Sequence, residues 1–330
     1  MLFERLRLAL ASGAAVLPAE GRIAVMNPAP DEDLSLLPRD RVEVISRHYA
    51  PHHAFRDAGY ATALAPGGPY GSAIFCLPRA RAEAEASLVA LHAVTTGPLI
   101  VDGQKTDGID SMLKALRARA TVGDVTAKAH GKCAAVSGVD LSDWLPGPPI
   151  RIAERFVTAP GVFSAGGIDP GSEALAKALP PALNGHVVDL GAGWGYLADA
   201  ILAREGVTVL DLVESDHAAL DAARANIADP RARFHWADAL SFRPETPVDH
   251  VVTNPPFHQG RAADPGLGQS FIRAAAAILA PRGRLWLVAN RHLPYENTLK
   301  DAFREVRTLG ETPSFKLYAA AAPARARRKG

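Results

Sequence analysis

Short apolar runs alternate with amphipathic segments along most of the first half of the chain. Runs rich in Val, Ile and Leu predict buried strands, and segments with apolar residues three and four apart predict helices. This alternation is typical of a mostly parallel sheet covered by helices. The expected strands are 23–26, 42–46, 73–77 and 99–101, the expected helices are 80–94 and 110–118, and a closing strand pair is expected near 121–127 and 132–139.

The second half repeats the alternation more clearly. Between the halves, residues 144–149 read Trp-Leu-Pro-Gly-Pro-Pro, a composition typical of a linker. A length of 330 residues also favours two domains, which we expect at 1–145 and 151–330. In the second, we expect strands at 187–190, 207–213, 233–236, 250–253 and 284–289, helices at 173–179, 195–205, 218–227 and 269–279, and an antiparallel edge from 307–309 and 314–319.

The two halves share a local pattern. Ala-Ile-Phe-Cys-Leu-Pro at 73–78 and Val-Val-Thr-Asn-Pro-Pro at 251–256 are each followed by a predicted helix and then a second apolar strand. An internal duplication explains this pattern, although generic strand-helix alternation also produces it. The predicted fold class is α/β, with two tandem Rossmann-like domains whose doubly wound, mostly parallel sheets have an antiparallel edge.

Composition excludes several classes of protein. With 48% hydrophobic and 22% charged residues, the chain is typical of a globular protein. Two cysteines cannot form a disulfide framework, which favours the reducing cytoplasm. No apolar run is long enough to span a bilayer.

The charges of the chain are balanced. With 36 basic and 35 acidic residues, the chain has no overall positive field that would attract nucleic acid. Any surface that binds nucleic acid must therefore be a local patch; one candidate comprises Lys114, Arg117, Arg119, Lys128 and Lys132.

A glycine-rich loop follows the first strand of the second half. The segment 187–195 reads Val-Val-Asp-Leu-Gly-Ala-Gly-Trp-Gly, with Asp189 at the strand end and Gly191 and Gly193 in the loop. Glycine lets the backbone turn sharply and approach a ligand, and the next helix presents free N–H groups to it. A dinucleotide fingerprint requires a third glycine where this chain has Tyr196, which argues against a dehydrogenase. The spacing is similar to that of methyltransferases that use S-adenosylmethionine (SAM).

Two acids follow the next two strands. A SAM site needs a carboxylate after the second strand for the ribose hydroxyls and a polar group after the third for the adenine. Glu214 and Asp238 stand at these positions. Asp211 is an alternative candidate for the contact with the ribose, but it lies inside the predicted strand rather than at its carboxyl end.

The segment Asn-Pro-Pro-Phe at 254–257 carries the predicted chemistry. Prolines fix φ and cannot donate hydrogen bonds, so Pro255 and Pro256 hold the Asn254 side chain and the Pro255 carbonyl as two converging acceptors. Two acceptors match the two hydrogens of a planar NH₂ group and draw its lone pair out of conjugation. Phe257 offers a face for stacking the group that bears the nitrogen.

Taken together, these segments resemble the RsmC-like ribosomal RNA guanine-N2 methyltransferases. The resemblance rests on the loop, on residues 254–258, and on Pro-Gly-Val-Phe-Ser at 160–164, Ile-Asp-x-Gly-Ser at 168–172, Val-Ala-Asn at 288–290, Leu-Pro-Tyr at 293–295 and Phe-Lys-Leu-Tyr at 315–318. It implies that Phe163, Asp169 and Asn254 also bind SAM. In the first half it is looser, resting on Gly-Gln-Lys-x-x-Gly at 103–108, and implies a degenerate copy with a structural or RNA-orienting role.

The first half lacks a cofactor motif of its own. Its first strand runs into Asn-Pro-Ala-Pro at 27–30, and Cys76 stands where the second half has Asn254. We therefore expect one SAM site per chain, in the second domain. His258 and the basic tail are candidate RNA contacts; the tail cations are Arg325, Arg327, Arg328 and Lys329.

The sequence thus predicts a cytoplasmic enzyme, monomeric and without metal or membrane partner, that methylates the exocyclic N2 of a guanine in ribosomal RNA or a ribosomal subunit. Small-subunit (16S) RNA is the expected substrate. Two alternatives stay open. The same acceptor pair could hold a protein glutamine amide or adenine N6 in DNA, and the chain could be an RNA-binding assembly factor that retains SAM without catalysis.

Overall fold

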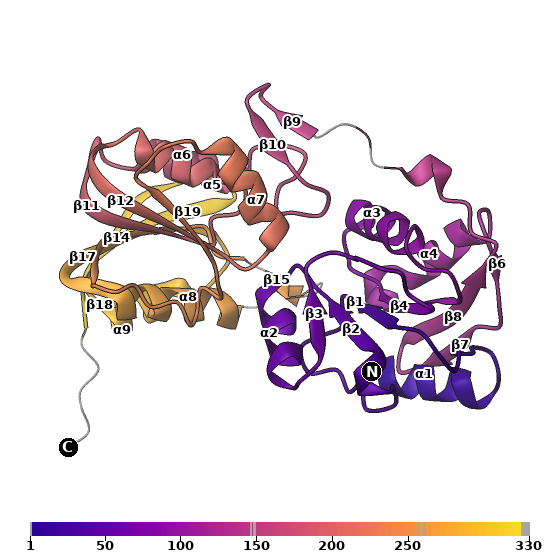
Figure 1. The fold of residues 1–330 in the computed structure, drawn as a ribbon. Coiled ribbons are helices and arrows are strands. Elements are labelled where there is room, and N and C mark those ends of the chain that lie inside the picture. Colours follow the sequence, from indigo (N-terminus) through magenta and orange to yellow (C-terminus); the bar gives the residue numbers. More distant parts are fainter. Residues whose placement is uncertain are drawn as a thin grey trace, which may run out of the picture. The chain divides into compact units, whose positions relative to one another are not determined.

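A computed structural model describes residues 2–145, 147, 150–256, 258–259, 262–263 and 265–324. The chain divides into two compact units, Met1–Pro148 and Pro149–Gly330 (Figure 1). Each unit has one large sheet between two layers of helices. Both sheets are mostly parallel with antiparallel strands at one edge, so the predicted fold class is confirmed.

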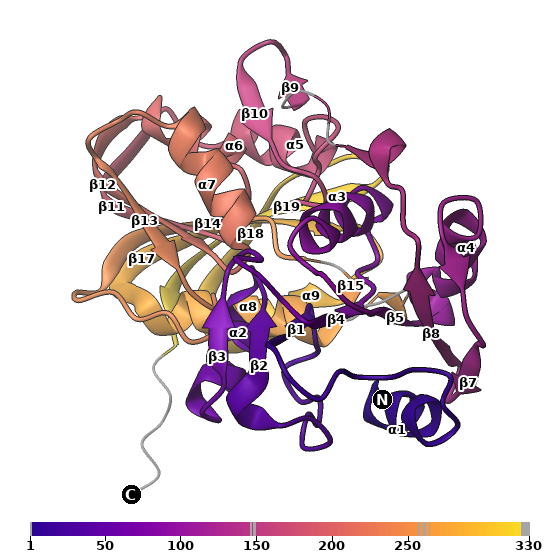
Figure 2. The same cartoon turned by 45° about the vertical axis from the view of Figure 1, so that its right-hand side comes forward.

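Unit 1 contains a sheet of order β3-β2-β1-β4-β5-β8-β6, with β7 paired to β8. Helices α3 and α4 pack on one face, and α1 and α2 pack on the other (Figure 2). Its strands are β1 (Ile23–Met26), β2 (Val42–Ile45), β3 (Ala61–Ala63), β4 (Ser72–Cys76), β5 (Leu99–Gln104), β6 (Thr121–Val122), β7 (Thr126–Lys128) and β8 (Gly131–Ser137). Its α-helices are α1 (Leu2–Ala11), α2 (Tyr49–Asp57), α3 (Arg81–His92) and α4 (Ile109–Leu116), and its 3₁₀ turns are η1 (Arg39–Arg41), η2 (Lys105–Asp107) and η3 (Ser142–Trp144).

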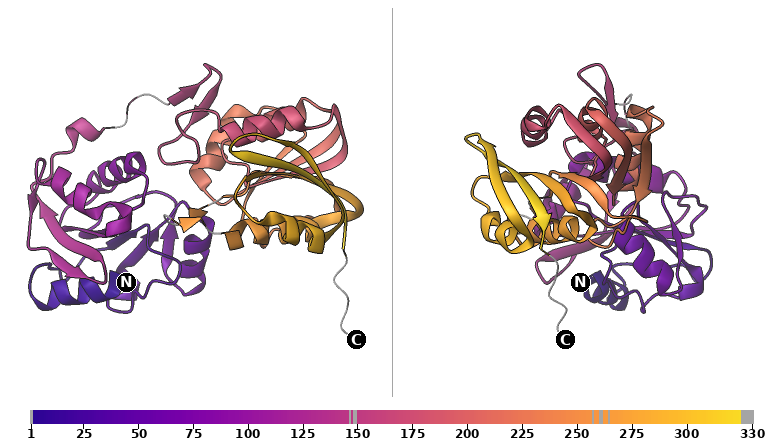
Figure 3. Two further views of the ribbon diagram at one scale, coloured as in Figure 1. Left: turned by 180° about the vertical axis from the view of Figure 1, so that it is seen from behind. Right: turned by 90° about the vertical axis from the view of Figure 1, so that its left-hand side faces the viewer.

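Unit 2 has the equivalent strand order, β13-β12-β11-β14-β17-β19-β18. Helices α5, α6 and α7 cover one face, while α8 and α9 cover the other (Figure 3). The sheet strands are β11 (Ala182–Leu190), β12 (Glu205–Glu214), β13 (Ala232–Trp236), β14 (Val248–Thr253), β17 (Leu279–Asn290), β18 (Phe303–Glu311) and β19 (Phe315–Pro323). The helices are α5 (Pro170–Ala178), α6 (Tyr196–Leu202), α7 (His217–Asn226), α8 (Pro265–Ile278) and α9 (Tyr295–Ala302).

Two small hairpins accompany the sheet of unit 2. One joins β9 (Ile150–Ile152) to β10 (Phe156–Thr158), and the other joins β15 (His258–Gln259) to β16 (Ala262–Ala263). The first precedes the main sheet in the chain, and its Phe156 packs in a small cluster with Trp194 of the glycine-rich loop. The β9–β10 hairpin therefore supports the loop from outside the sheet.

The register of the strands shows that the sheets are built alike. In unit 1, Met26 pairs with both Ile45 and Phe75, and Asn27 N donates to Ile45 O at 2.9 Å. In unit 2, Leu190 pairs with Val213, and Gly191 N donates to Val213 O at 2.9 Å. The common strand order and turn support the interpretation of an internal duplication.

The structure contains elements that the sequence pattern did not predict. Helices α2 and α9, the short strand β3 and the hairpin β9–β10 are all additional. Helix α2 has only Phe55 buried, so it shows no apolar stripe that a periodicity argument could detect. None of the helices within the described residues is long and apolar enough to cross a bilayer.

Candidate functional site

The glycine-rich loop connects β11 to α6 through left-handed backbone. Gly191 and Gly193 have φ of 81° and 56°, a region that side chains with a Cβ rarely adopt. A Cβ on Gly193 would meet nothing within 4 Å, so the backbone here is open to an incoming ligand. Trp194 is buried against Phe156, with ring centroids 5.2 Å apart, which fixes the far side of the loop.

Asp189 is a buried carboxylate beneath this loop. It is 0% exposed, and neither oxygen forms a hydrogen bond of normal geometry with the described residues. Burial, with a contribution from nearby Glu214, raises the pKa of Asp189 to about 8. A buried acid without a partner is costly unless it stays protonated or a cationic or hydrogen-bonding group compensates it.

Glu214 closes β12 and contacts the loop directly. Its Oε2 accepts a hydrogen bond from Gly193 N at 2.8 Å, and its Oε1 accepts from Ser215 N and Asp216 N at 2.7 and 2.8 Å. Burial raises the pKa of Glu214 despite these bonds. Since Oε2 accepts a hydrogen bond only from Gly193 N among the described residues, it has a lone pair available for a hydroxyl donor on the loop side.

The other two acids considered from the sequence lie in different environments. Asp211 is buried within β12 between two histidines: His186 Nε2 lies 2.7 Å from its Oδ2, and His235 Nε2 lies 2.9 Å from its Oδ1. Both carboxylate oxygens of Asp211 therefore contact histidines inside the sheet rather than groups at the end of the strand. Asp238 follows β13 at the same sheet edge as Glu214, because Ala237 N donates to Glu214 O at 3.0 Å. Its Oδ1 accepts from Leu240 N at 3.0 Å.

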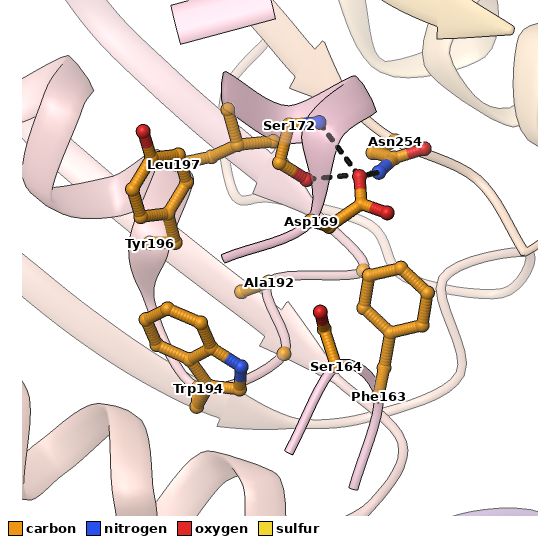
Figure 4. A pocket seen from close by; sticks show the side chains of 11 residues that line it. Phe163, Ser164, Asp169, Ser172, Ala192, Trp194, Tyr196, Leu197 and Asn254 are labelled. Atoms are coloured by element: carbon orange, nitrogen blue, oxygen red, sulfur yellow. Dashed lines mark hydrogen bonds between the residues drawn. The ribbon is translucent and has the colours of Figure 1, made fainter. Parts of the chain in front are cut away.

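Asn254 is held in one amide orientation. Its Nδ2 donates to Asp169 Oδ2 and to Ser172 Oγ, both at 2.8 Å (Figure 4). Asp169 also caps α5 by accepting a 2.7 Å bond from Ser172 N. With both N–H groups engaged, the Asn254 Oδ1 atom is left as an acceptor; it is buried and has no hydrogen-bond partner among the described residues.

A cavity opens between the glycine-rich loop, the start of α5 and Asn254. Its empty volume is about 370 Å³, including its mouth. Phe163, 56% exposed, and Asp169 both line it, and Figure 4 shows the second oxygen of Asp169 on the side of Phe163. The full lining is Phe163, Ser164, Asp169, Ser172, Gly191, Ala192, Gly193, Trp194, Tyr196, Leu197 and Asn254.

Five of the eight cofactor residues expected from the sequence line this cavity; these are Phe163, Asp169, Gly191, Gly193 and Asn254. Asp189 is buried below it, while Glu214 and Asp238 lie further along the same sheet edge. Of the expected catalytic segment, Pro255 is buried and Pro256 is exposed. Phe257 and the tail cations Arg325, Arg327, Arg328 and Lys329 lie outside the described residues, and His258 is described only as part of strand β15.

Two supporting residues were not singled out from the sequence. Ser172 lies 82 positions before Asn254 in the chain, yet its hydroxyl accepts an Asn254 N–H. Asn226, at the end of α7, donates to Trp194 O at 2.8 Å and to Val157 O at 2.9 Å, so it joins the loop to β10. The Asp-x-Gly-Ser segment marked Ser172 only as a motif member, and no local signal marked Asn226.

This set of groups suits a cationic ligand whose hydroxyl groups need acceptors. Three carboxylates lie on or just below the loop edge: Asp169, Asp189 and Glu214. SAM carries a sulfonium, an ammonium and a ribose diol, so the orphaned Asp189 carboxylate, the open Gly193 backbone and the Glu214 acceptor fit its chemistry. The described residues include no cluster of His, Cys, Asp and Glu that could hold a metal ion.

Comparison with known proteins gives a consistent result. The family model "Methyltransferase small domain" matches residues 153–319. The "Ribosomal RNA small subunit methyltransferase C" of Hahella chejuensis is 30% identical over 321 residues, covering 90% of this chain and 93% of that protein. Its namesake from Shewanella sp. (strain MR-4) is 31% identical over 263 residues, or 76% of each chain.

A solved structure is similar over both units. It is described as the T. thermophilus 16S rRNA N2 G1207 methyltransferase (RsmC) in complex with AdoMet and guanosine. The TM-score is 0.77 at 30% sequence identity, and the match covers 93% of this chain and 89% of that chain. The similarity therefore extends through unit 1, which the family model does not match.

The buried Asp189 predicts a specific pH dependence of stability in the ligand-free protein. Its pKa is about 8 in the folded chain and about 3.9 when unfolded, so only the folded state keeps this proton between those values. Stability of the wild type should therefore fall as pH rises through this window, whereas Asp189→Asn cannot titrate. As pH rises, the free energy of unfolding of the wild type should therefore fall relative to that of Asp189→Asn, by at most about 1.4 kcal/mol per pH unit.

Denaturant unfolding at pH 4.5, 6 and 7.5 measures this difference. The exposed helix residue Asp301 provides the control, since Asp301→Asn should follow the wild type at each pH. Parallel pH profiles for the wild type and Asp189→Asn would contradict the assignment of a protonated, uncompensated Asp189.

Proposed function

The chain belongs to the methyltransferase small domain family and, within it, to the RsmC-like methyltransferases, and we propose that it methylates the exocyclic N2 of a guanine in small-subunit ribosomal RNA. The resemblance expected from the sequence is confirmed. By analogy with the solved relative, the target is the guanine equivalent to G1207 of 16S RNA. Such a substrate places the reaction in the cytoplasm.

The observation that carries the proposal is the fixed amide of Asn254. Because Asp169 and Ser172 accept both of its N–H groups, its Oδ1 can serve only as an acceptor at the cavity wall. A target amine donates one hydrogen to that atom and the other to the Pro255 carbonyl. This geometry places the nitrogen lone pair out of the plane of the base, where it can attack an electrophile.

SAM supplies the electrophile when bound, a methyl group on a sulfonium. Gly191 and Gly193 allow the backbone to approach it closely, Glu214 accepts from the ribose and Asp238 from the adenine amine. Asp169 provides negative charge for its cationic end, Asp189 below the loop loses its proton when that cation binds, and Phe163 forms the wall at the mouth. The transferred methyl makes the amine strongly acidic, so its proton passes to water without a dedicated base.

Unit 1 is proposed to have no cofactor site. By register, Asn27 occupies the position of Gly191, Ser46 that of Glu214, and Cys76 that of Asn254. Asn27 keeps the left-handed turn with φ of 57°, but, unlike Gly191, it carries a side chain where a glycine lets the backbone approach a ligand closely. The proposed stoichiometry is therefore one SAM per chain, and the proposed boundaries are 1–145 and 151–330.

These observations disfavour the two alternatives that the sequence left open, a different methyl acceptor and a factor without catalysis. A glutamine amide or adenine N6 could use the same acceptors, but the two relatives described above, which match 76% and 90% of this chain, are small-subunit rRNA methyltransferases by name. A factor that only retains SAM would have no need to fix Asn254 Oδ1 as an acceptor. We propose a monomer acting on the RNA or on an assembled subunit.

Glu214 and Asp216 provide a matched pair for testing the ribose contact. Glu214→Ala should weaken SAM binding by roughly 2 to 4 kcal/mol, because it removes charge-assisted hydrogen bonds and releases Gly193. Asp216 caps α7 by accepting from Ala218 N at 3.0 Å. Asp216→Ala should instead cost about 1 kcal/mol of stability and leave SAM affinity within a few-fold. Calorimetric titration and thermal unfolding separate the two effects, and equal losses of affinity would refute the assignment.

The function itself is tested by single-turnover methyl transfer to unmodified small-subunit RNA. The wild type should produce N2-methylguanosine. Asn254→Ala should reduce the rate by on the order of 10² or more while SAM affinity changes only a few-fold. Ser172→Ala should give a smaller loss, because Asp169 still holds one N–H of Asn254.

His258→Ala is the control for general-base catalysis. If orientation is sufficient, the rate stays near that of the wild type and shows no pH dependence near a histidine pKa of about 6.5. Near wild-type transfer by Asn254→Ala, or methylation at a nitrogen other than guanine N2, would overturn the proposal.

A further inference from the structure

Two sequence segments that lie far apart in the chain meet at the first turn of α5. One is Asp-x-Gly-Ser at 169–172, which begins the helix, and the other is Phe-Lys-Leu-Tyr at 315–318, which begins β19. Helix α5 packs against β17 and β19, and Phe315 packs on the apolar cluster that includes the buried residues of α5. The first turn of α5 therefore rests on the start of β19.

Gly171 lies between the two segments. It is buried in the first turn of the helix, and its φ is outside the left-handed region that favours glycine. A Cβ at this position would lie 3.1 Å from Phe315 Cε1 and 3.0 Å from Asp169 Oδ2, both closer than an ordinary van der Waals contact. The aromatic ring and the carboxylate, rather than the backbone conformation, therefore require glycine here.

The carboxylate oxygen beside Gly171 is the one that orients Asn254. Asp169 Oδ2 accepts from Ser172 N at 2.7 Å and from Asn254 Nδ2 at 2.8 Å. One donor lies on the helix and the other follows β14, so a displacement of this oxygen would disturb the helix cap and the amide together. The contact of Phe315 with Gly171 thus bears on the orientation of the proposed acceptor.

Phe315 is itself firmly held. Its N–H donates to Thr312 Oγ1 at 2.9 Å, and its carbonyl accepts from Thr312 N at 2.8 Å. The strand pairs with β17, and Lys316 and Tyr318 both donate to Glu296 Oε1 on α9, at 2.6 and 2.7 Å. The segment is therefore tied to a tight turn, to the sheet and to α9, and its aromatic ring is a rigid support for α5.

We propose that Phe315 is a positioning residue for methyl transfer, because its packing against Gly171 fixes the Asp169 carboxylate. The fixed carboxylate in turn keeps the Asn254 amide oriented. The proposal rests on the proposed function in taking Asn254 as the acceptor for the target amine. Phe315 is not one of the described residues that line the cavity, so it acts through packing. A misplacement of about 1 Å in such a support can cost on the order of 10² in rate.

A double-mutant cycle on the full-length chain tests this coupling. Gly171→Ala adds a methyl group against the ring and should reduce single-turnover transfer, at saturating SAM and RNA, by on the order of 10². Phe315→Leu loosens the support and should cost roughly tenfold. The double variant should recover to about the rate of Phe315→Leu, because the shorter side chain makes room for the added methyl. Independent sites would make the double variant slower than either single variant.

Two matched substitutions control for the position of the change. Gly166→Ala adds a methyl group in open space on the segment before α5, and Phe234→Leu makes the same truncation in β13. Gly166→Ala should transfer at the wild-type rate to within about twofold. Phe234→Leu should not rescue Gly171→Ala.

A second measurement follows the Asn254 amide without RNA or SAM. Side-chain amide protons that are held by two acceptors exchange slowly with water. Nitrogen-edited NMR should therefore show protected Asn254 amide protons in the wild type, assigned by their absence in Asn254→Ala. Protection should fall in Gly171→Ala and return when Phe315→Leu is added.

Three results would overturn the proposal: a double variant slower than Gly171→Ala, rescue by Phe234→Leu, or unchanged amide protection in Gly171→Ala. If Gly171→Ala does not fold, Phe315→Leu decides alone, since unaltered transfer and protection in that variant contradict a positioning role. Failure of the proposed function is a separate result, because the wild type would then make no N2-methylguanosine although the amide protection responded as expected.

Discussion

The proposed chemistry depends on one small hydrogen-bond network, in which two neighbouring residues fix the orientation of the Asn254 amide. Asp169 at the start of α5 and Ser172 one turn later accept both N–H groups of Asn254, which follows β14. The amide can then present only its oxygen. Since α5 and β14 are far apart in the chain, the orientation of the proposed acceptor is a direct consequence of how the sheet and its first helix pack.

The two sheets share an architecture but differ in the side chains at the edge where we propose that unit 2 alone binds SAM. Both have the same strand order and a left-handed residue after the first strand. In unit 2 that residue is Gly191, whereas in unit 1 it is Asn27, and an acid and an amide are replaced by Ser46 and Cys76. A parallel sheet therefore supplies the edge at which ligands can bind, but the side chains at that edge decide whether one does.

Sequence patterns were sufficient for the buried central strands, because buried parallel strands are continuous apolar runs; β1 was predicted to the residue, whereas the short strand β3 and the β9–β10 hairpin were missed. They were insufficient for α2 and α9, which are eight or nine residues long and largely polar. At the site, Asn254 and Glu214 were identifiable from their place after strands. Two other contacts depend on packing between distant segments, which no local pattern encodes. One is the hydrogen bond between Asn254 and Ser172, and the other is the contact of Asp211 with His186 and His235.

The most direct measurement of the central claim is a map of modified nucleosides in small-subunit ribosomal RNA from cells with and without this chain. The account predicts that one N2-methylguanosine disappears when the gene is inactivated and returns when the intact chain is restored. An unchanged set of N2-methylguanosines, together with loss of a methyl group from adenine or from a protein glutamine, would contradict it.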